Sequence, residues 1–255
     1  MLDLDNIVLG YNKNNTFINL NEDLQIQQTK LYPLRLTLED IHNQLKQVRF
    51  NTFYQSTGGS ASQNANLEAA KLIPFNLMYY YLFITKQQIP TPQLLTCEYV
   101  YRFCEPSIIR EHYYSFKPEY KQQGYSTLLF TLEELTGRIC RAYNSFNREV
   151  ELAFRIMEDG STFVRYNFQK DYVDGVDLEV KYCDKLFGII CSQKNMRTDQ
   201  YRVAKETTRR SNYDSSNKIY MAIDRFNHDT CGDIWIFSQI EYERLRREIK
   251  GKERK

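Results

Sequence analysis

The clearest pattern of apolar and polar positions begins at Thr131 and predicts a long helix. Apolar side chains recur there at steps of three or four residues, at Leu135, Ile139, Tyr143, Phe146, Val150, Phe154 and Met157. Because an α-helix has 3.6 residues per turn, these positions share one face. We therefore expect an amphipathic helix of about six turns, which Gly160 ends.

Shorter apolar runs after this helix have the length and alternation of strands. They are residues 162–168, 175–182, 186–192 and 218–223, with a last short run at 233–237. Helical patterns cover 198–210, between the third and fourth strands, and 239–249 near the end of the chain. The resulting order is α-β-β-β-α-β, which predicts an α/β (α+β) domain over residues 131–255.

The region 1–130 predicts mainly helices, apart from a hairpin at 6–20. Its helical patterns lie at 38–50, at 65–85 with a break at Pro74, and in two short stretches between 93 and 120. Thr37 and Asp40 have the spacing of a capping box at the start of the first helix. We expect this region to be an α-rich accessory part that serves specificity or dimerisation.

Composition narrows the class of protein. The 255 residues are 42% hydrophobic and carry a net charge of +2, which predicts a globular fold and gives no support for a polyanion binder along the whole chain. The six cysteines form no CxxC pair, which argues against a structural zinc site. No apolar run approaches the ~20 residues of a spanning helix. We therefore expect a cytoplasmic protein with reduced thiols and no membrane association.

The strand at 175–182 carries its charged side chains on one face. Successive side chains of a strand point to opposite faces of the sheet. One face therefore carries Val176, Leu178 and Val180, and the other carries Asp177, Glu179 and Lys181. The charged face is either solvated, with weak ion pairs across the strands, or part of a metal site.

The following strand decides which side chains lie near Asp177. A two-residue turn at Asp184-Lys185 would set Asp177 opposite Ser192, with Lys194 a step further on. A shift of one residue would move these partners to the other face of the sheet. The predicted arrangement therefore depends on the turn.

The segment "GVDLEVKYCDKLFGI" and the element order around it resemble the PD-(D/E)XK nuclease superfamily. The resemblance covers about residues 131–237, and it implies a restriction-endonuclease-like core that binds Mg²⁺ or Mn²⁺. It makes Asp177 the metal-binding aspartate and Glu149 the carboxylate on the helix that supports it. Lys194 would be the lysine that positions the attacking water.

The third strand departs from the E-x-K motif of that superfamily. Lys194 is present, but Ser192 stands where an acid or glutamine is expected, and Gln193 lies beside it. We include Ser192 and Gln193 among the candidate catalytic residues. A second alignment takes as the E-x-K motif the residues Glu179, Val180 and Lys181, with Asp159 or Asp171 upstream.

A basic run follows the predicted hairpin and is a candidate nucleic-acid contact. The cations expected to grip phosphates are Arg197, Arg202, Lys205, Arg209 and Arg210. The alternative interpretation of this run is an ordinary solvated helix.

The resemblance as a whole implies a metal-dependent DNA endonuclease of the restriction or phage-defence type, acting on duplex DNA. Symmetric cleavage of both strands would favour a homodimer. The competing hypothesis is a non-catalytic DNA-binding or assembly protein that retains a nuclease-like fold, because the third-strand acid is missing.

Overall fold

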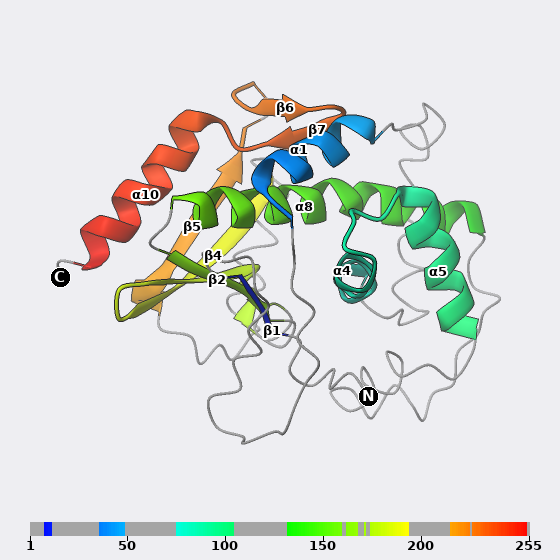
Figure 1. Cartoon of the computed structure of the whole chain (residues 1–255), viewed down its shortest axis with the longest axis horizontal. Coiled ribbons are helices and arrows are strands. Elements are labelled where there is room, and N and C mark those ends of the chain that lie inside the picture. Colours follow the sequence, from blue (N-terminus) through cyan, green and yellow to red (C-terminus); the bar gives the residue numbers. More distant parts are fainter. Residues whose placement is uncertain are drawn as a thin grey trace, which may run out of the picture. The chain divides into compact units, whose positions relative to one another are not determined.

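The computed structural model describes residues 8–11, 36–48, 75–104, 132–159, 162–167, 171, 174–193, 215–224 and 226–253. These residues form helices and a small mixed sheet, so the fold is of the α+β class (Figure 1). The chain divides into two compact units, one made of residues 1–43 and 148–255 and the other of 44–147. The accessory role expected for residues 1–130 stays a prediction.

The long helix expected after Thr131 is present as α8, Leu132–Glu158. Its apolar stripe is buried: Ile139 and Tyr143 have no exposed surface, and Val150 and Phe154 are each 1% exposed. Burying a full apolar side chain contributes roughly 1.5–3 kcal/mol. Tertiary packing of this stripe therefore stabilises the helix far more than its intrinsic propensity does.

A five-stranded sheet forms the centre of the first unit, in the strand order β1-β2-β3-β4-β5. The strands are β1 Val8–Tyr11, β2 Thr162–Asn167, β3 Leu178–Tyr182, β4 Lys185–Gln193 and β5 Lys218–Ile223. The pairs β1·β2, β2·β3 and β3·β4 are antiparallel, whereas β4 and β5 are parallel. The strands predicted at 162–168, 175–182, 186–192 and 218–223 are thus confirmed.

The apolar face of the sheet follows the predicted alternation. Val176, Leu178 and Val180 are at most 1% exposed, and Ile189 and Ile219 of the neighbouring strands have no exposed surface. Partners in register lie on the same face of a sheet, and Ile189 pairs with both Leu178 and Ile219. The core of the unit is therefore on this side.

The turn of the β3–β4 hairpin differs from the expected one. Tyr182 pairs with Lys185, so the turn residues are Cys183 and Asp184 rather than Asp184 and Lys185. Cys183 takes a left-handed backbone conformation, with φ of 51°, which a tight hairpin turn requires and which sequence reasoning assigns to glycine or asparagine. The register of β4 consequently moves by two residues, which keeps every side chain on its expected face.

The last part of the first unit holds a small hairpin and a helix. β6 Asp229–Cys231 pairs antiparallel with β7 Ile234–Ile236, and α10 Gln239–Glu253 follows and lies beside β5 (Figure 1). A capping box begins α10, because Ser238 N–H donates to Glu241 and Glu241 N–H lies 3.4 Å from Ser238 Oγ. The strand expected at 233–237 and the terminal helix are both present.

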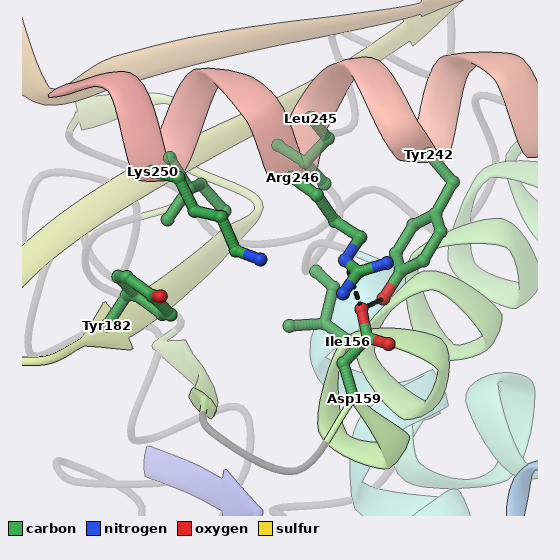
Figure 2. A pocket seen from close by; sticks show the side chains of 8 residues that line it. Ile156, Asp159, Tyr182, Tyr242, Leu245, Arg246 and Lys250 are labelled. Atoms are coloured by element: carbon green, nitrogen blue, oxygen red, sulfur yellow. Dashed lines mark hydrogen bonds and ion pairs between the residues drawn. The ribbon is translucent and has the colours of Figure 1, made fainter. Parts of the chain in front are cut away.

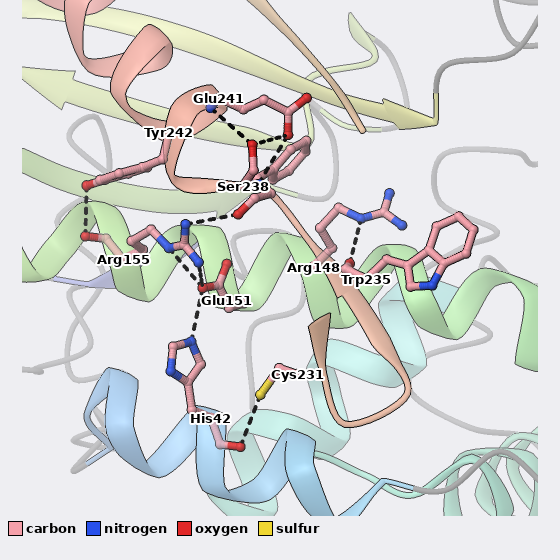
Figure 3. A network of polar contacts seen from close by, with 10 residues as sticks. His42, Arg148, Glu151, Arg155, Cys231, Trp235, Ser238, Glu241 and Tyr242 are labelled. Carbon is pink, nitrogen blue, oxygen red and sulfur yellow. Dashed lines mark hydrogen bonds and ion pairs between the residues drawn. The ribbon is translucent and has the colours of Figure 1, made fainter. Parts of the chain in front are cut away.

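A buried polar network joins α8 to the rest of the first unit (Figure 3). Glu151 has no exposed surface, and its Oε1 accepts hydrogen bonds from Arg155 Nε at 2.9 Å and lies 3.1 Å from His42 Nε2. Arg155 also donates to the carbonyl of Phe237 at 3.0 Å. His42 lies in α1, Leu38–Gln47, which the expected Thr37–Asp40 capping box begins.

The second unit contains α4, Phe75–Lys86, and α5, Pro92–Cys104. α4 begins directly after Pro74, where the sequence predicts a break. Its aromatic side chains belong to the core, because Tyr79, Tyr80 and Phe83 are at most 1% exposed. The Tyr79 hydroxyl donates to Asn147 at 2.8 Å.

Several predicted features lie outside the described residues. They are most of the hairpin at 6–20, most of the helical pattern before Pro74, residues 105–120, and the helix at 198–210. Among the helices that the structure does describe, none has both the length and the apolar composition needed to cross a membrane.

Candidate acidic site

Asp177 lies directly before β3 and forms hydrogen bonds with two residues of β4, the other strand of the hairpin. Its backbone N–H donates to the Ile189 carbonyl at 3.0 Å, and its carboxylate accepts a hydrogen bond from Cys191 N–H at 2.6 Å. Hydrogen bonds to an ionised carboxylate are short and about twice as strong as neutral ones. The half-buried Asp177 side chain therefore has a fixed direction, unlike a surface charge.

Glu149 lies on α8 and is buried, with 4% of its surface exposed. The neighbouring Arg148 is 5% exposed and donates from Nε to the Trp235 carbonyl at 3.1 Å. Burial lowers the pKa of the Arg148 guanidinium, and acidic groups around it, including Cys191, Glu149 and Asp177, oppose this shift. A buried charge is costly unless it is compensated, so Arg148 is the natural counter-charge to these carboxylates.

Glu149 and Asp177 shift the pKa values of the same two groups, the buried Tyr166 hydroxyl and the partly buried Cys191 thiol. Burial is the main reason that the pKa of the Cys191 thiol is raised, and the negative charges of Asp177 and Glu149 raise it further. The pKa of Tyr166 is raised in the same way, by burial and then by Asp171 and Glu149. Three carboxylates, those of Glu149, Asp171 and Asp177, thus raise the pKa values of both Tyr166 and Cys191.

Asp171 belongs to this group through a direct contact. The Tyr166 hydroxyl donates to Asp171 Oδ2 at 3.2 Å, and the Asp171 carbonyl accepts a hydrogen bond from Gly175 N–H. We call Glu149, Asp171 and Asp177 the acidic cluster. Groups with strongly shifted pKa values that share charged neighbours are typical of functional sites, although structural ion-pair networks shift pKa values too.

The donor set of the acidic cluster fits Mg²⁺ better than a softer metal. Mg²⁺ prefers hard oxygen ligands and is usually held by one or two carboxylates together with water. Within the described ranges, however, no group of three or more His, Cys, Asp or Glu side chains is arranged so that it could hold a metal ion. A metal here would therefore need water or a bound phosphate to complete its coordination.

The two charged residues of the alternative E-x-K motif, Glu179 and Lys181, differ in how far they are exposed to solvent. Glu179 is 1% exposed and lies opposite Gly188, whereas Lys181 is exposed and lies opposite Leu186. The face that carries them is therefore covered at Glu179 and open to solvent at Lys181. This differs from the expected charged face, which predicted the same environment for both residues.

The candidate residues Ser192 and Gln193, at the end of β4, do not lie opposite Asp177. Ser192 is half-buried, with its hydroxyl 3.5 Å from the Met221 carbonyl, and Gln193 is exposed. The register places Asp177 level with Ile189 and Ile190, so the expected position opposite Ser192 is wrong because of the turn at Cys183. Lys194 lies outside the described residues.

The basic residues proposed to contact phosphates also lie outside the described part of the chain. They are Arg197, Arg202, Lys205, Arg209 and Arg210.

Sequence reasoning missed the groups whose pKa values the two carboxylates shift. Arg148, Tyr166 and Cys191 lie in elements that were predicted correctly, but nothing in their local pattern indicates that Glu149 and Asp177 act on them. Comparisons of the chain with protein-family models, with curated proteins and with solved structures found no match. The candidate site therefore rests on its own geometry and chemistry.

Proposed function

We propose that this chain is a metal-dependent DNA endonuclease with a core of the PD-(D/E)XK type. The observation that carries the proposal is that Glu149 from α8 and Asp177, directly before β3, both shift the pKa values of Arg148 and of Cys191, whose backbone N–H donates to Asp177. This is the pair of carboxylates that the resemblance implies for metal binding. Asp177 is half-buried rather than sealed in the core, as a ligand that must reach a metal and a phosphate requires.

The sheet supports the same proposal. An antiparallel meander β2-β3-β4 is followed by β5, which is parallel to β4. A parallel neighbour requires a crossover connection of a dozen or more residues, and residues 194–214 connect the two strands. The α-β-β-β-α-β core order places its second helix in this connection, and that placement is part of the proposal.

The residues would divide the work as follows. Asp177 and Glu149 would hold Mg²⁺ or Mn²⁺, with Arg148 limiting the repulsion between their charges. The metal, when bound, lowers the pKa of a coordinated water and stabilises negative charge on the phosphate. Lys194 would orient that water, and the cations between Arg197 and Arg210 would hold the DNA backbone.

Two observations favour a second candidate function. The described residues contain no group of three ligands for a metal, and Ser192 stands where the third-strand acid would be. A protein that keeps the fold but has lost catalysis would have this arrangement. Such a protein would bind or assemble on DNA without cutting it.

A cleavage assay distinguishes the two functions. Purified protein is incubated with supercoiled plasmid in Mg²⁺, in Mn²⁺ and in chelator, and Asp177→Asn is compared with Asp184→Asn, an exposed aspartate in the turn of the same hairpin. We expect metal-dependent cleavage that falls by orders of magnitude in Asp177→Asn and is unchanged in Asp184→Asn. Equal cleavage activity of Asp177→Asn and Asp184→Asn would show that cleavage does not need the Asp177 carboxylate, and it would refute the proposal.

Two further variants refine the result. Glu179→Gln should reduce cleavage much less than Asp177→Asn, and the opposite ranking would move the site to Glu179 and Lys181. Replacing Arg202, Lys205, Arg209 and Arg210 by alanine should weaken DNA binding and flatten its salt dependence. If the protein binds plasmid in a salt-dependent way but never cuts it, the non-catalytic function is supported.

A further inference from the structure

A hollow between α8, β3 and α10 lies away from the acidic cluster (Figure 2). Its empty space amounts to about 340 Å³ when the open solvent at its mouth is included. Its apolar wall is formed by Ile156, Leu245 and Ile249. Tyr182, which also lines it, lies five residues after Asp177, and this separation corresponds to about 17 Å along a strand.

The polar side of this hollow carries hydrogen-bond donors that the structure leaves unused. Among the described residues, nothing accepts a hydrogen bond from the Lys250 ammonium, from the Tyr182 hydroxyl or from the two terminal nitrogens of Arg246. Figure 2 shows the Lys250 ammonium directed into the space between Tyr182 and Arg246. Three donor groups from two elements thus line one cavity.

Arg246 is held in place by an ion pair with Asp159. Its Nε lies 2.7 Å from Asp159 Oδ2, and the same oxygen lies 2.5 Å from the Tyr242 hydroxyl. Burial raises the pKa of Tyr242, and its hydrogen bond to Asp159 raises it further, so the hydroxyl keeps its proton. The guanidinium is therefore oriented through Nε, and its two terminal nitrogens stay available.

The charge of the hollow favours an anion. Arg246 and Lys250 contribute two positive charges and Asp159 one negative charge, which leaves a net charge of +1 on the lining. Lys185, the register partner of Tyr182, adds another cation at the same end of the sheet. An oxyanion accepts several hydrogen bonds at once, and an arginine fork and a lysine ammonium are the usual donors to phosphate.

We propose that the hollow lined by Tyr182, Arg246 and Lys250 is a binding site for a phosphate group. The phosphate belongs either to a small phosphorylated molecule or to the 5′ end of a nucleic acid, since both present the same terminal oxyanion. The site is independent of the acidic cluster, and it stands whether or not Asp177 and Glu149 hold a metal.

The test is a titration of the isotopically labelled full chain with inorganic phosphate at constant ionic strength, followed by NMR. We expect saturable shifts at Tyr182 and Lys250, with a dissociation constant on the order of 1 mM. Lys250→Ala should weaken binding about tenfold because it removes a charged hydrogen-bond donor, and Lys250→Arg should restore most of it. Tyr182→Phe keeps the ring and removes only the hydroxyl, so a smaller loss is expected.

The control is Arg247→Ala, which removes an exposed cation from the same helix outside the hollow. It should leave phosphate binding unchanged. Shifts that do not saturate, or equal affinities in Lys250→Ala and the wild type, would overturn the proposal. So would an equal loss in the Arg247→Ala control, because binding would then reflect the net charge of the helix.

A second arm identifies the source of the phosphate. A short oligonucleotide with a 5′ phosphate is compared with the same oligonucleotide without it. Tighter binding of the phosphorylated form, lost in Lys250→Ala, would assign the hollow to a nucleic-acid end. Binding of free phosphate with no preference between the oligonucleotides would assign it to a small phosphorylated molecule.

Discussion

Arg155→Met removes one partner of the buried ion pair on α8, and its effect follows from the geometry. Arg155 reaches Glu151 Oε1 through Nε at 2.9 Å and through a terminal nitrogen at 2.5 Å. Its side chain is 13% exposed, and that of Glu151 has no exposed surface. Methionine fills a similar volume but donates no hydrogen bond, so the substitution isolates the loss of the charge and its donors.

The expected loss of stability is large because the acid stays behind. Without Arg155, the Glu151 carboxylate keeps only His42, and within the described residues its second oxygen already has no hydrogen-bond partner. Removing one partner of a buried pair typically costs about 3–5 kcal/mol. A protein of this kind has a total unfolding free energy of about 5–15 kcal/mol, so the variant should be severely destabilised.

Urea unfolding followed by tryptophan fluorescence measures this loss. Trp235 is the only tryptophan in the chain and lies in the same compact unit as the ion pair, so its signal reports on that unit. Arg247→Met, the same substitution at an exposed position of α10, should change the unfolding free energy by less than about 0.5 kcal/mol.

The double variant Arg155→Met with Glu151→Leu removes both charges. It should recover most of the stability, because replacing a whole buried pair by apolar residues is often close to neutral. A loss below about 1 kcal/mol in Arg155→Met, or a double variant as unstable as the single one, would refute the reasoning.

Two further substitutions and a comparison of cysteine reactivity test other parts of the structure. Ser238→Ala removes the cap of α10 and should cost about 1 kcal/mol in the same unfolding assay, and no loss would contradict the cap. Tyr79→Phe leaves the buried Asn147 oxygen without its hydroxyl donor, and it should cost about 1–3 kcal/mol by far-ultraviolet circular dichroism. Burial raises the pKa of the Cys140 thiol from 9.0 to about 11, so at pH 8 iodoacetamide should modify exposed Cys183 much faster than Cys140 by peptide mass spectrometry. Because the folded pKa of Cys140 is the higher one, its contribution to stability is complete below pH 9 and is lost as the pH rises through about 11.

Local periodicity alone determined most of the described elements. The apolar spacing from Leu135 to Met157 predicts α8, and the alternation from Val176 to Val180 predicts both the strand and its buried face. The break at Pro74 and the capping box at Thr37 mark helix starts that the structure confirms. These signals are readable because they depend only on chain geometry and on neighbours within one or two turns.

The register of the hairpin could not be read from the sequence. It depends on Cys183 adopting a left-handed conformation, for which a cysteine gives no local signal. The burial of Glu179 was also unpredictable, since strict alternation with charged residues indicates a solvated face. Whether a strand face is covered depends on which other segments lie over it, and local sequence does not contain that information.

The residues of the candidate site could also be predicted only in part. Asp177 and Glu149 could be named from the motif and its element order, but the groups whose pKa values they shift, Arg148, Tyr166 and Cys191, could not. The sequence fixes which charges a helix or strand carries, whereas the low-dielectric surroundings that shift a pKa arise only when separate elements pack together. The partners of a charge are therefore decided by the tertiary structure, because a buried charge must find its counter-charge in space and not along the chain.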